Sequence, residues 1–274
     1  RAALAAAPRA ALAAAPRAAL AAALLASWVA AGCGTARAPR APLGDGEERI
    51  VGARLAALVR AGHRSASDPT VSGYVRTLGE RMARLSDRPG IPYTFEVIAD
   101  PSSRAFALPG GYLYVTTGLL SRLDTQAELA GVLGHGLAHV AAGHPMGRLV
   151  EVLGRSGVDA ILTSPREGTP SPATRRALET LLAGYPREME RHADHLGLLF
   201  TARVGLNPEG MIHAMEKVDA ASGGNGVFWE GSGKGLPDQA RRIEALKAEV
   251  KSKGLDAGLP NGRDPYAPVK SRPR

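Results

Sequence analysis

The sequence predicts an α+β domain that is mainly helical and carries a small sheet. Three observations lead to this prediction. Several segments place apolar residues at helical spacing, short strand-like segments flank a Pro-Gly-Gly turn, and 45% of the residues are hydrophobic. That apolar content excludes a wholly disordered chain. Residues 47–253 contain these patterns and are expected to form one domain.

The expected elements follow from periodicity and turn residues. Helices are predicted at residues 47–62, 70–85, 125–142, 173–183, 187–203 and 238–251. Residues 91–99 are typical of a strand, and residues 104–108 and 112–116 flank the turn. Asp124 is expected to cap the helix at 125–142. That helix is apolar almost all round, which indicates that it is buried.

The formal charge of +8 lies outside the expected domain. Residues 1–33 carry +3, residues 34–43 carry +2 and residues 261–274 carry +3, whereas residues 44–260 are neutral. A basic binding face is therefore not supported, and no nucleic-acid partner is expected. The single cysteine excludes an internal disulfide and a four-cysteine zinc site.

Residues 1–33 predict a signal peptide that ends at a lipid-modified cysteine. Arginines precede an uncharged apolar stretch that is shorter than the ~20 residues of a spanning helix. Small residues directly before Cys33 resemble a bacterial lipoprotein box, although Ala30 stands where Leu is usual. The alternative is an ordinary signal peptide with an incidental cysteine.

On the lipoprotein interpretation, the protein faces the periplasm and is anchored to the membrane through Cys33. Gly34 is not the Asp that commonly retains lipoproteins at the inner membrane, which favours the outer membrane. Residues 34–46 are then a linker. The basic tail at residues 254–274 is expected to be disordered.

Two pairs of residues suggest a metal site. His135 and His139 are four residues apart, so both imidazoles lie on one helix face, where they can bind one ion. A solvated helix face is the alternative, but the apolar flanks indicate burial, and buried histidines need partners. Glu190 and Asp194 are also four apart; Glu190 can complete a His-His-Glu zinc site, and Asp194 can hold a ligand imidazole. Glu188 as the ligand, or a solvated face for Glu190, are alternatives.

Two motifs resemble a known enzyme family. Residues 105–144 and the run Glu190-Arg191-His192-Ala193-Asp194-His195-Leu196-Gly197 are similar to the zinc metallopeptidase family that includes HtpX and the CAAX prenyl proteases, with periplasmic lipoprotein relatives. The resemblance covers about residues 47–250. It implies a zincin-like fold of the gluzincin type with the small sheet flanking the metal-binding helix.

The resemblance also implies roles for particular residues. His135, His139 and Glu190 would bind one Zn²⁺ per chain. Asp194 would hold one ligand histidine by the ring nitrogen that does not bind the metal. An extended polypeptide substrate would pair with a strand, either the one containing Phe106, Ala107 and Leu108 or the one at Tyr112–Thr116.

The chain departs from the family at two catalytic positions. The family motif is His-Glu-x-x-His, and this chain has Gly136 where the glutamate stands. That glutamate is the general base, which moves a proton from the attacking water to the leaving amine, and its loss typically costs ~10²–10⁴-fold in rate. Leu236 occupies the aligned position of a histidine that steadies the tetrahedral intermediate. Spacing favours none of Glu188, His144, His192 and His195 as a substitute base.

Three hypotheses share the fold, the zinc and the location, and differ only in turnover. The first is an envelope-tethered zinc metalloendopeptidase for protein quality control, whose activity is either impaired or supported by a base not yet identified. The second is a pseudopeptidase that binds zinc and extended polypeptides as a scaffold or chaperone-like factor. The third is that Gly136 is an engineered change or an error, since Glu and Gly codons can differ by one base.

Overall fold

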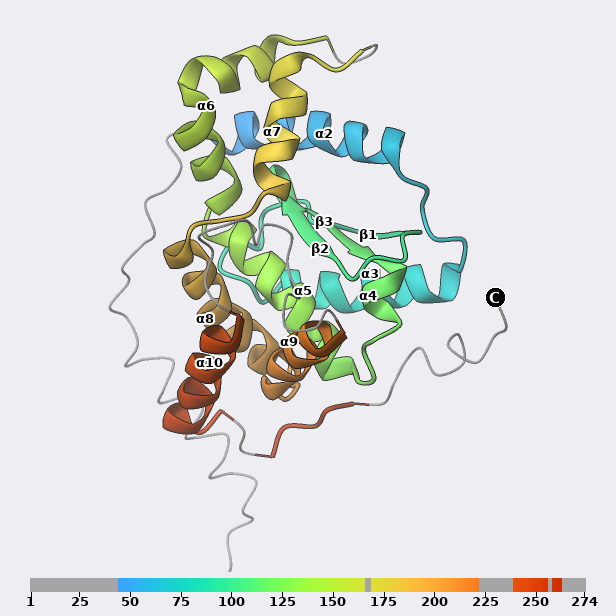
Figure 1. Cartoon of the computed structure of the whole chain (residues 1–274), viewed down its shortest axis with the longest axis vertical. Coiled ribbons are helices and arrows are strands. Elements are labelled where there is room, and N and C mark those ends of the chain that lie inside the picture. Colours follow the sequence, from blue (N-terminus) through green and yellow to red (C-terminus); the bar gives the residue numbers. More distant parts are fainter. Residues whose placement is uncertain (1–43, 166–168, 222–238, 256–257, 263–274) are drawn as a thin grey trace, which may run out of the picture. The chain divides into compact units, whose positions relative to one another are not determined.

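The computed structural model describes residues 44–165, 169–221, 239–255 and 258–262, all within one compact unit. Figure 1 shows helices arranged around a small sheet. The elements in chain order are α2 (Asp45–Gly62), α3 (Pro69–Ala83), β1 (Thr94–Ile98), β2 (Ala105–Leu108), a short 3-10 turn (Pro109–Gly111), β3 (Tyr112–Thr116), α4 (Thr117–Leu120), α5 (Gln126–Ala141), α6 (His144–Thr163), α7 (Pro172–Leu182), α8 (Arg187–Arg203), α9 (Glu209–Ala221) and α10 (Gln239–Lys253). The predicted α+β, mainly helical class is confirmed.

The sheet has the strand order β1-β3-β2. β3 is parallel to β1 and antiparallel to β2, so the predicted Pro-Gly-Gly segment joins a hairpin. Gly110 and Gly111 have φ of 73° and 91°, a region that side chains with a Cβ rarely adopt. The turn therefore requires glycine at both positions.

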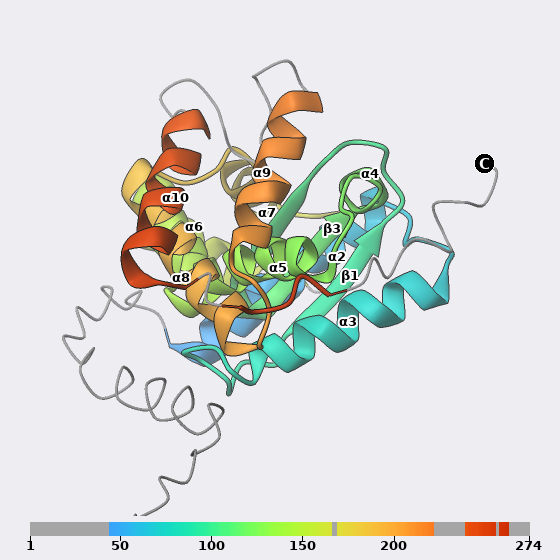
Figure 2. The same ribbon diagram turned by 90° about the horizontal axis from the view of Figure 1, so that it is seen from below.

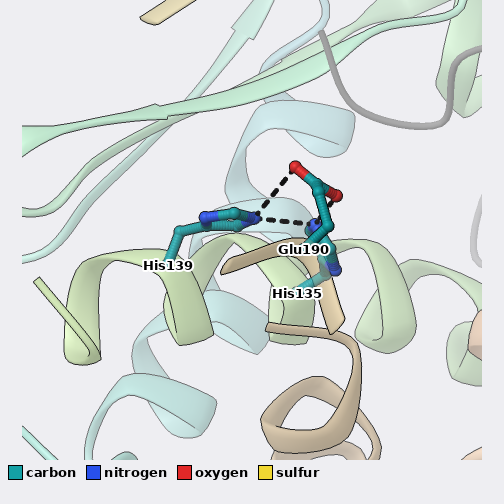
Figure 3. A group of neighbouring side chains, drawn as sticks. All are labelled: His135, His139 and Glu190. Atoms are coloured by element: carbon teal, nitrogen blue, oxygen red, sulfur yellow. Dashed lines mark hydrogen bonds and ion pairs between the residues drawn. The ribbon is translucent and has the colours of Figure 1, made fainter. Parts of the chain in front are cut away.

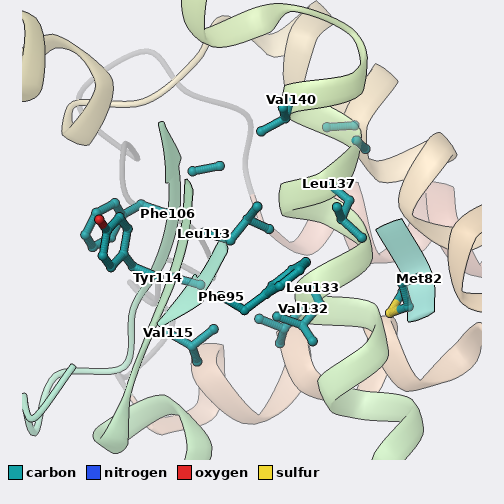
Figure 4. Packing of buried hydrophobic residues seen from close by; sticks show 14 of the residues in the cluster. Met82, Phe95, Phe106, Leu113, Tyr114, Val115, Val132, Leu133, Leu137 and Val140 are labelled. Atoms are coloured by element: carbon teal, nitrogen blue, oxygen red, sulfur yellow. The ribbon is translucent and has the colours of Figure 1, made fainter. Parts of the chain in front are cut away.

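The two faces of the sheet pack against different helices. Phe95 and Leu113 are register partners and lie on the face toward α5, as Figure 4 shows. Phe106 and Tyr114 stack on the opposite face, with ring centroids 4.9 Å apart. On that side Arg60 of α2 lies over the Tyr112 ring. This alternation is the period of two expected for strands buried on both faces.

The metal-motif helix α5 lies at the centre of the domain (Figure 2), where it packs against α8, α9, α3 and the sheet. Its residues from Ala127 to Val140 are all buried. Glycines allow its neighbours to come close. A Cβ on Gly134 would lie 2.9 Å from the Gly197 carbonyl oxygen, and a Cβ on Gly131 would lie 2.4 Å from the Met211 Cα. A Cβ on Gly197, the last residue of the second motif, would lie 3.1 Å from the His135 Cα, so this glycine allows α8 to lie close to α5.

Several boundaries differ from the predictions. The side chain of Thr125, not that of Asp124, accepts the capping hydrogen bond from the Glu128 backbone N–H. Asp124 instead pairs with Lys217 of α9. Helices α6 and α9 were not predicted. Gly154 interrupts α6 with φ 69° and ψ 172°, which breaks the helical periodicity there.

The two ends of the described region also differ from the predictions. Helix α2 begins at Asp45, inside the stretch predicted as a linker. Residues 258–262 were predicted to be disordered, but the Pro260 and Asn261 carbonyls accept hydrogen bonds from the Asn207 and Ala127 N–H groups. These two bonds attach the segment to α5 and to the start of α9. Among the helices described, none is long and apolar enough to cross a lipid bilayer.

Candidate metal centre

Three buried side chains from two helices meet at one point (Figure 3). His135 and His139 project from one face of α5, and Glu190 reaches them from α8. The two Nε2 atoms are 3.0 Å apart. Glu190 Oε2 lies 3.5 Å from His135 Nε2, and Glu190 Oε1 lies 3.6 Å from His139 Nε2. The structure thus brings together the three residues that the sequence selected as ligands.

The spacing of these three donors fits a metal ion. Zinc ligands at 2.0–2.2 Å in tetrahedral geometry lie about 3.3–3.6 Å from one another. The separations of 3.0, 3.5 and 3.6 Å between the three donors fall close to this range. Two imidazoles and one carboxylate also form the donor set of zinc sites that keep a fourth position open. The cluster can therefore bind one divalent cation such as zinc.

A second layer of charged groups surrounds the donors. Asp194, one turn after Glu190, places Oδ1 3.0 Å from His135 Nδ1. Arg242 of α10 donates to both Asp194 oxygens, with Nε 2.8 Å from Oδ2 and Nη2 2.7 Å from Oδ1. Its Nη2 also lies 2.9 Å from Glu190 Oε2. One guanidinium thus links the Glu190 carboxylate of the cluster to the Asp194 carboxylate beside His135.

This layer sets the protonation of the buried groups. Burial opposes ionisation of Asp194, but Arg242 and His135 outweigh it and lower the pKa of Asp194 to about 2. Burial likewise opposes protonation of His135, yet Asp194 and Glu190 raise its pKa. For His139, burial and the neighbouring His135 and His144 rings lower the pKa well below its ordinary value. A neutral His139 imidazole is the form that binds metal.

The far side of His139 faces other aromatic rings. The buried Tyr185 ring stacks on the His139 ring at a centroid distance of 4.1 Å. His144 Nδ1 lies 3.1 Å from His139 Nδ1, and His144 Nε2 lies 3.2 Å from His192 Nδ1. Burial, reinforced by His192 and His135, lowers the pKa of His144 to about 3. His144 is therefore neutral near pH 7.

No substitute for the missing base is found among the described candidates. Glu188 is exposed and pairs with Arg191. His195 pairs with Glu249 of α10. His144 and His192 lie beyond the Nδ1 edge of His139, whereas the other donors surround its Nε2.

Gly136 itself is buried within α5. It has no side-chain atom that could accept a proton. Leu236 and Cys33 lie outside the described residues, so their predicted roles stay predictions.

The sheet topology separates the two candidate substrate strands. β3, at Tyr112–Thr116, is the central strand and is paired on both sides. β2, which contains Phe106, Ala107 and Leu108, is an edge strand and packs against α5. Of the two, only β2 has an edge that no described strand occupies.

The sequence alone pointed to no site role for Arg242 and to no function for His144. Arg242 is 48 residues from Asp194, so only a folded structure could reveal the pairing. A signal for His144 was present, because a histidine after Gly143, five residues beyond His139, can turn back toward the helix it follows. Gly143 has φ 73°. Such a left-handed glycine commonly ends a helix.

Comparison with known proteins agrees with this geometry. The family model described as "Peptidase family M48" matches residues 69–250, which include both helices that supply the cluster.

Three relatives illustrate the similarity. A putative β-barrel assembly-enhancing protease of Vibrio cholerae is 29% identical over 60% of this chain and 36% of its own length. The mitochondrial metalloendopeptidase OMA1 of Schizosaccharomyces pombe is 26% identical over 66% of this chain and 54% of its own length. The metalloprotease YcaL of Escherichia coli is 25% identical over 67% and 73%, respectively. The chain thus spans about a third to a half of the length of the first two.

Proposed function

Because the chain belongs to peptidase family M48, we propose that it is a zinc metalloendopeptidase-type protein whose hydrolytic step is impaired by Gly136. One observation carries this proposal. A buried two-histidine, one-glutamate cluster is intact, while the helix position next to His135 has no side chain. The site therefore keeps the side chains that bind a metal but lacks the side chain that would assist peptide hydrolysis.

The residues at and around the cluster have different roles in the proposed function. His135, His139 and Glu190 hold one zinc per chain. A bound zinc would activate water and polarise a peptide carbonyl. Asp194 orients the His135 ring, and Arg242 holds both carboxylates in place. No described strand pairs with the outer side of β2, which supports the addition of an extended polypeptide as a further strand there, beside α5.

Gly136 limits the proton transfers. Peptide hydrolysis requires a group that takes a proton from water and returns it to the leaving amine. Glu188 is exposed and ion-paired, and His144 lies behind a ligand ring, so neither replaces that group. The expected loss of ~10²–10⁴-fold leaves hydrolysis slow or absent.

The second candidate function is peptide binding without cleavage. Gly136 favours it, because the metal cluster and the strand edge are retained while position 136 has no side chain to accept a proton. Such a pseudopeptidase would hold extended or misfolded chains as a scaffold or chaperone-like factor. The two candidates differ in turnover alone.

The location belongs to the proposal as well. The curated relatives named β-barrel assembly-enhancing protease support a role in the bacterial envelope. Small residues before Cys33 support a lipid anchor and a periplasm-facing protein, with the outer membrane favoured. Envelope polypeptides in extended form are then the expected substrates or clients.

Casein degradation by the zinc-loaded protein, with and without a chelator, tests the proposal. We expect slow or undetectable cleavage by the wild type and a chelator-sensitive gain in Gly136→Glu. Gly136→Gln is the matched control, because it adds nearly the same volume without a general base. Rapid chelator-sensitive cleavage by the wild type would refute the impairment. Two inert variants that still bind zinc would favour the second candidate.

A further inference from the structure

Three histidines form a row that leads away from the metal cluster. His139 belongs to the cluster, His144 lies behind it, and His192 lies behind His144. The ring centroids are 5.0 Å apart for the first pair and 5.2 Å for the second. His139 is wholly buried and His144 is 6% exposed, while His192 is only partly buried. The row therefore connects a buried ring to the outer part of the domain.

Two features of the backbone place these rings, the turn at Gly143 and the spacing of residues along α8. α5 ends at Ala141, and α6 starts at His144, directly after the left-handed Gly143, with the His144 ring next to that of His139. His192 lies two residues after Glu190 on α8, a spacing that turns the two side chains to different sides of the helix. Glu190 thus faces the metal donors while His192 faces His144.

The contacts allow one consistent pattern of hydrogen bonds. His139 Nε2 is the atom nearest to His135 and Glu190, so a metal there requires a lone pair on Nε2 and a proton on Nδ1. That Nδ1–H then lies 3.1 Å from His144 Nδ1 and can donate to it. His144 then carries its proton on Nε2 and donates to His192 Nδ1. In this pattern each of the two nitrogen–nitrogen contacts contains one proton, so each can be a hydrogen bond.

We propose that His144, supported by His192, is a positioning residue that fixes the ring orientation and the tautomer of His139 for metal binding. The proposal rests on the proposed zinc site and assigns no catalytic step to His144. It gives His139 the kind of support that Asp194 gives His135 from the other side. The two ligand imidazoles are then held by different chemistry, a charged carboxylate for His135 and a neutral imidazole for His139.

Nitrogen-15 NMR of the metal-free protein at neutral pH tests the pattern without any metal. We expect His139 to carry its proton on Nδ1, and His144 and His192 to carry theirs on Nε2. His144→Asn keeps an acceptor oxygen close to the place of Nδ1 and should preserve the His139 tautomer. His144→Leu removes the acceptor and should shift the His139 resonances toward a mixture of tautomers. A wild-type His139 protonated on Nε2 would overturn the proposal.

Zinc affinity, measured by competition with a chelator, supplies the second readout. Loss of an outer partner of a metal-bound histidine typically costs 10–100-fold in affinity. We expect such a loss in His144→Leu, near wild-type affinity in His144→Asn, and little change in Tyr185→Phe, which keeps the ring stacked on His139. Thermal unfolding of each metal-free variant checks that the fold is retained.

The outcomes separate the two proposals. A wild type that binds no zinc refutes the proposed function, and the NMR result still decides the histidine row. Equal zinc affinity in folded His144→Leu and wild type refutes the positioning role, and leaves the zinc site in place.

Discussion

Replacing Arg242 with methionine tests whether the guanidinium holds the metal centre together. In the wild type, Arg242 donates two hydrogen bonds of 2.7 and 2.8 Å to Asp194 and lies 2.9 Å from Glu190. Only 11% of the Arg242 side chain and 5% of each carboxylate are exposed. Methionine retains most of the apolar volume, but it leaves two buried carboxylates without their cation.

The expected cost follows from that burial. Breaking a buried ion pair by removing one partner typically costs ~3–5 kcal/mol of unfolding free energy. In a domain of this size that corresponds to a fall in Tm of roughly 6–20 °C. The pKa of Asp194, held at about 2 mainly by Arg242 against the effect of burial, should rise. Zinc should recover part of the lost stability, because it supplies positive charge beside Glu190.

Chemical denaturation of the metal-free protein at pH 7 measures this cost. The control is Lys251→Met, which removes an equal charge from an exposed position on the same helix and should change stability by less than ~0.5 kcal/mol. Arg242→Lys keeps the charge but not the paired hydrogen bonds, so it should fall between the two. A loss in Arg242→Met no larger than that in Lys251→Met would refute this account of the second layer of charges.

Further predictions concern packing and pH. Gly131→Ala should destabilise the domain by about 2 kcal/mol in urea unfolding, because its Cβ would lie 2.4 Å from the Met211 Cα. Gly73→Ala should instead stabilise it by up to ~1 kcal/mol, since a Cβ there has no neighbour within 4 Å, and equal effects in the two variants would contradict the close approach of α5 and α9. The pKa of Glu249 is lowered to about 2, because the hydrogen bond from His195 and the ion pair with Lys253 outweigh the effect of partial burial. The advantage of the wild type over Glu249→Gln, about 1 kcal/mol after solvent screening, should be present above pH 4.5 and be lost as the pH falls toward 2; an unchanged difference at pH 3 and pH 7 would contradict it.

The parts of the site that were predictable depend on short-range spacing. His135 and His139 lie one helical turn apart, so any regular helix brings them to one face. Glu190 and Asp194 repeat that spacing on α8. The apolar flanks of α5 predicted its burial, and the Pro-Gly-Gly turn predicted the hairpin. In each case a local pattern was enough, because one element contains all the relevant residues.

The parts that were missed depend on contacts between elements. Arg242 lies on α10 and pairs with carboxylates 48 and 52 positions earlier, and nothing in the periodicity of α10 reveals this. The cap of α5 was misplaced by one residue, because Asp124 and Thr125 are both good capping residues. Asp124 is instead drawn to Lys217, which a local pattern does not show. The sequence likewise did not predict that β2 is an edge strand, since strand order is set by tertiary packing.

Equilibrium dialysis against buffered zinc tests the central claim most directly. If His135, His139 and Glu190 bind one ion, the wild type will hold one zinc per chain. Folded His139→Ala will then bind it at least ~100-fold more weakly. Equal zinc occupancy in the two proteins would show that the metal binds elsewhere, and would contradict the site described here.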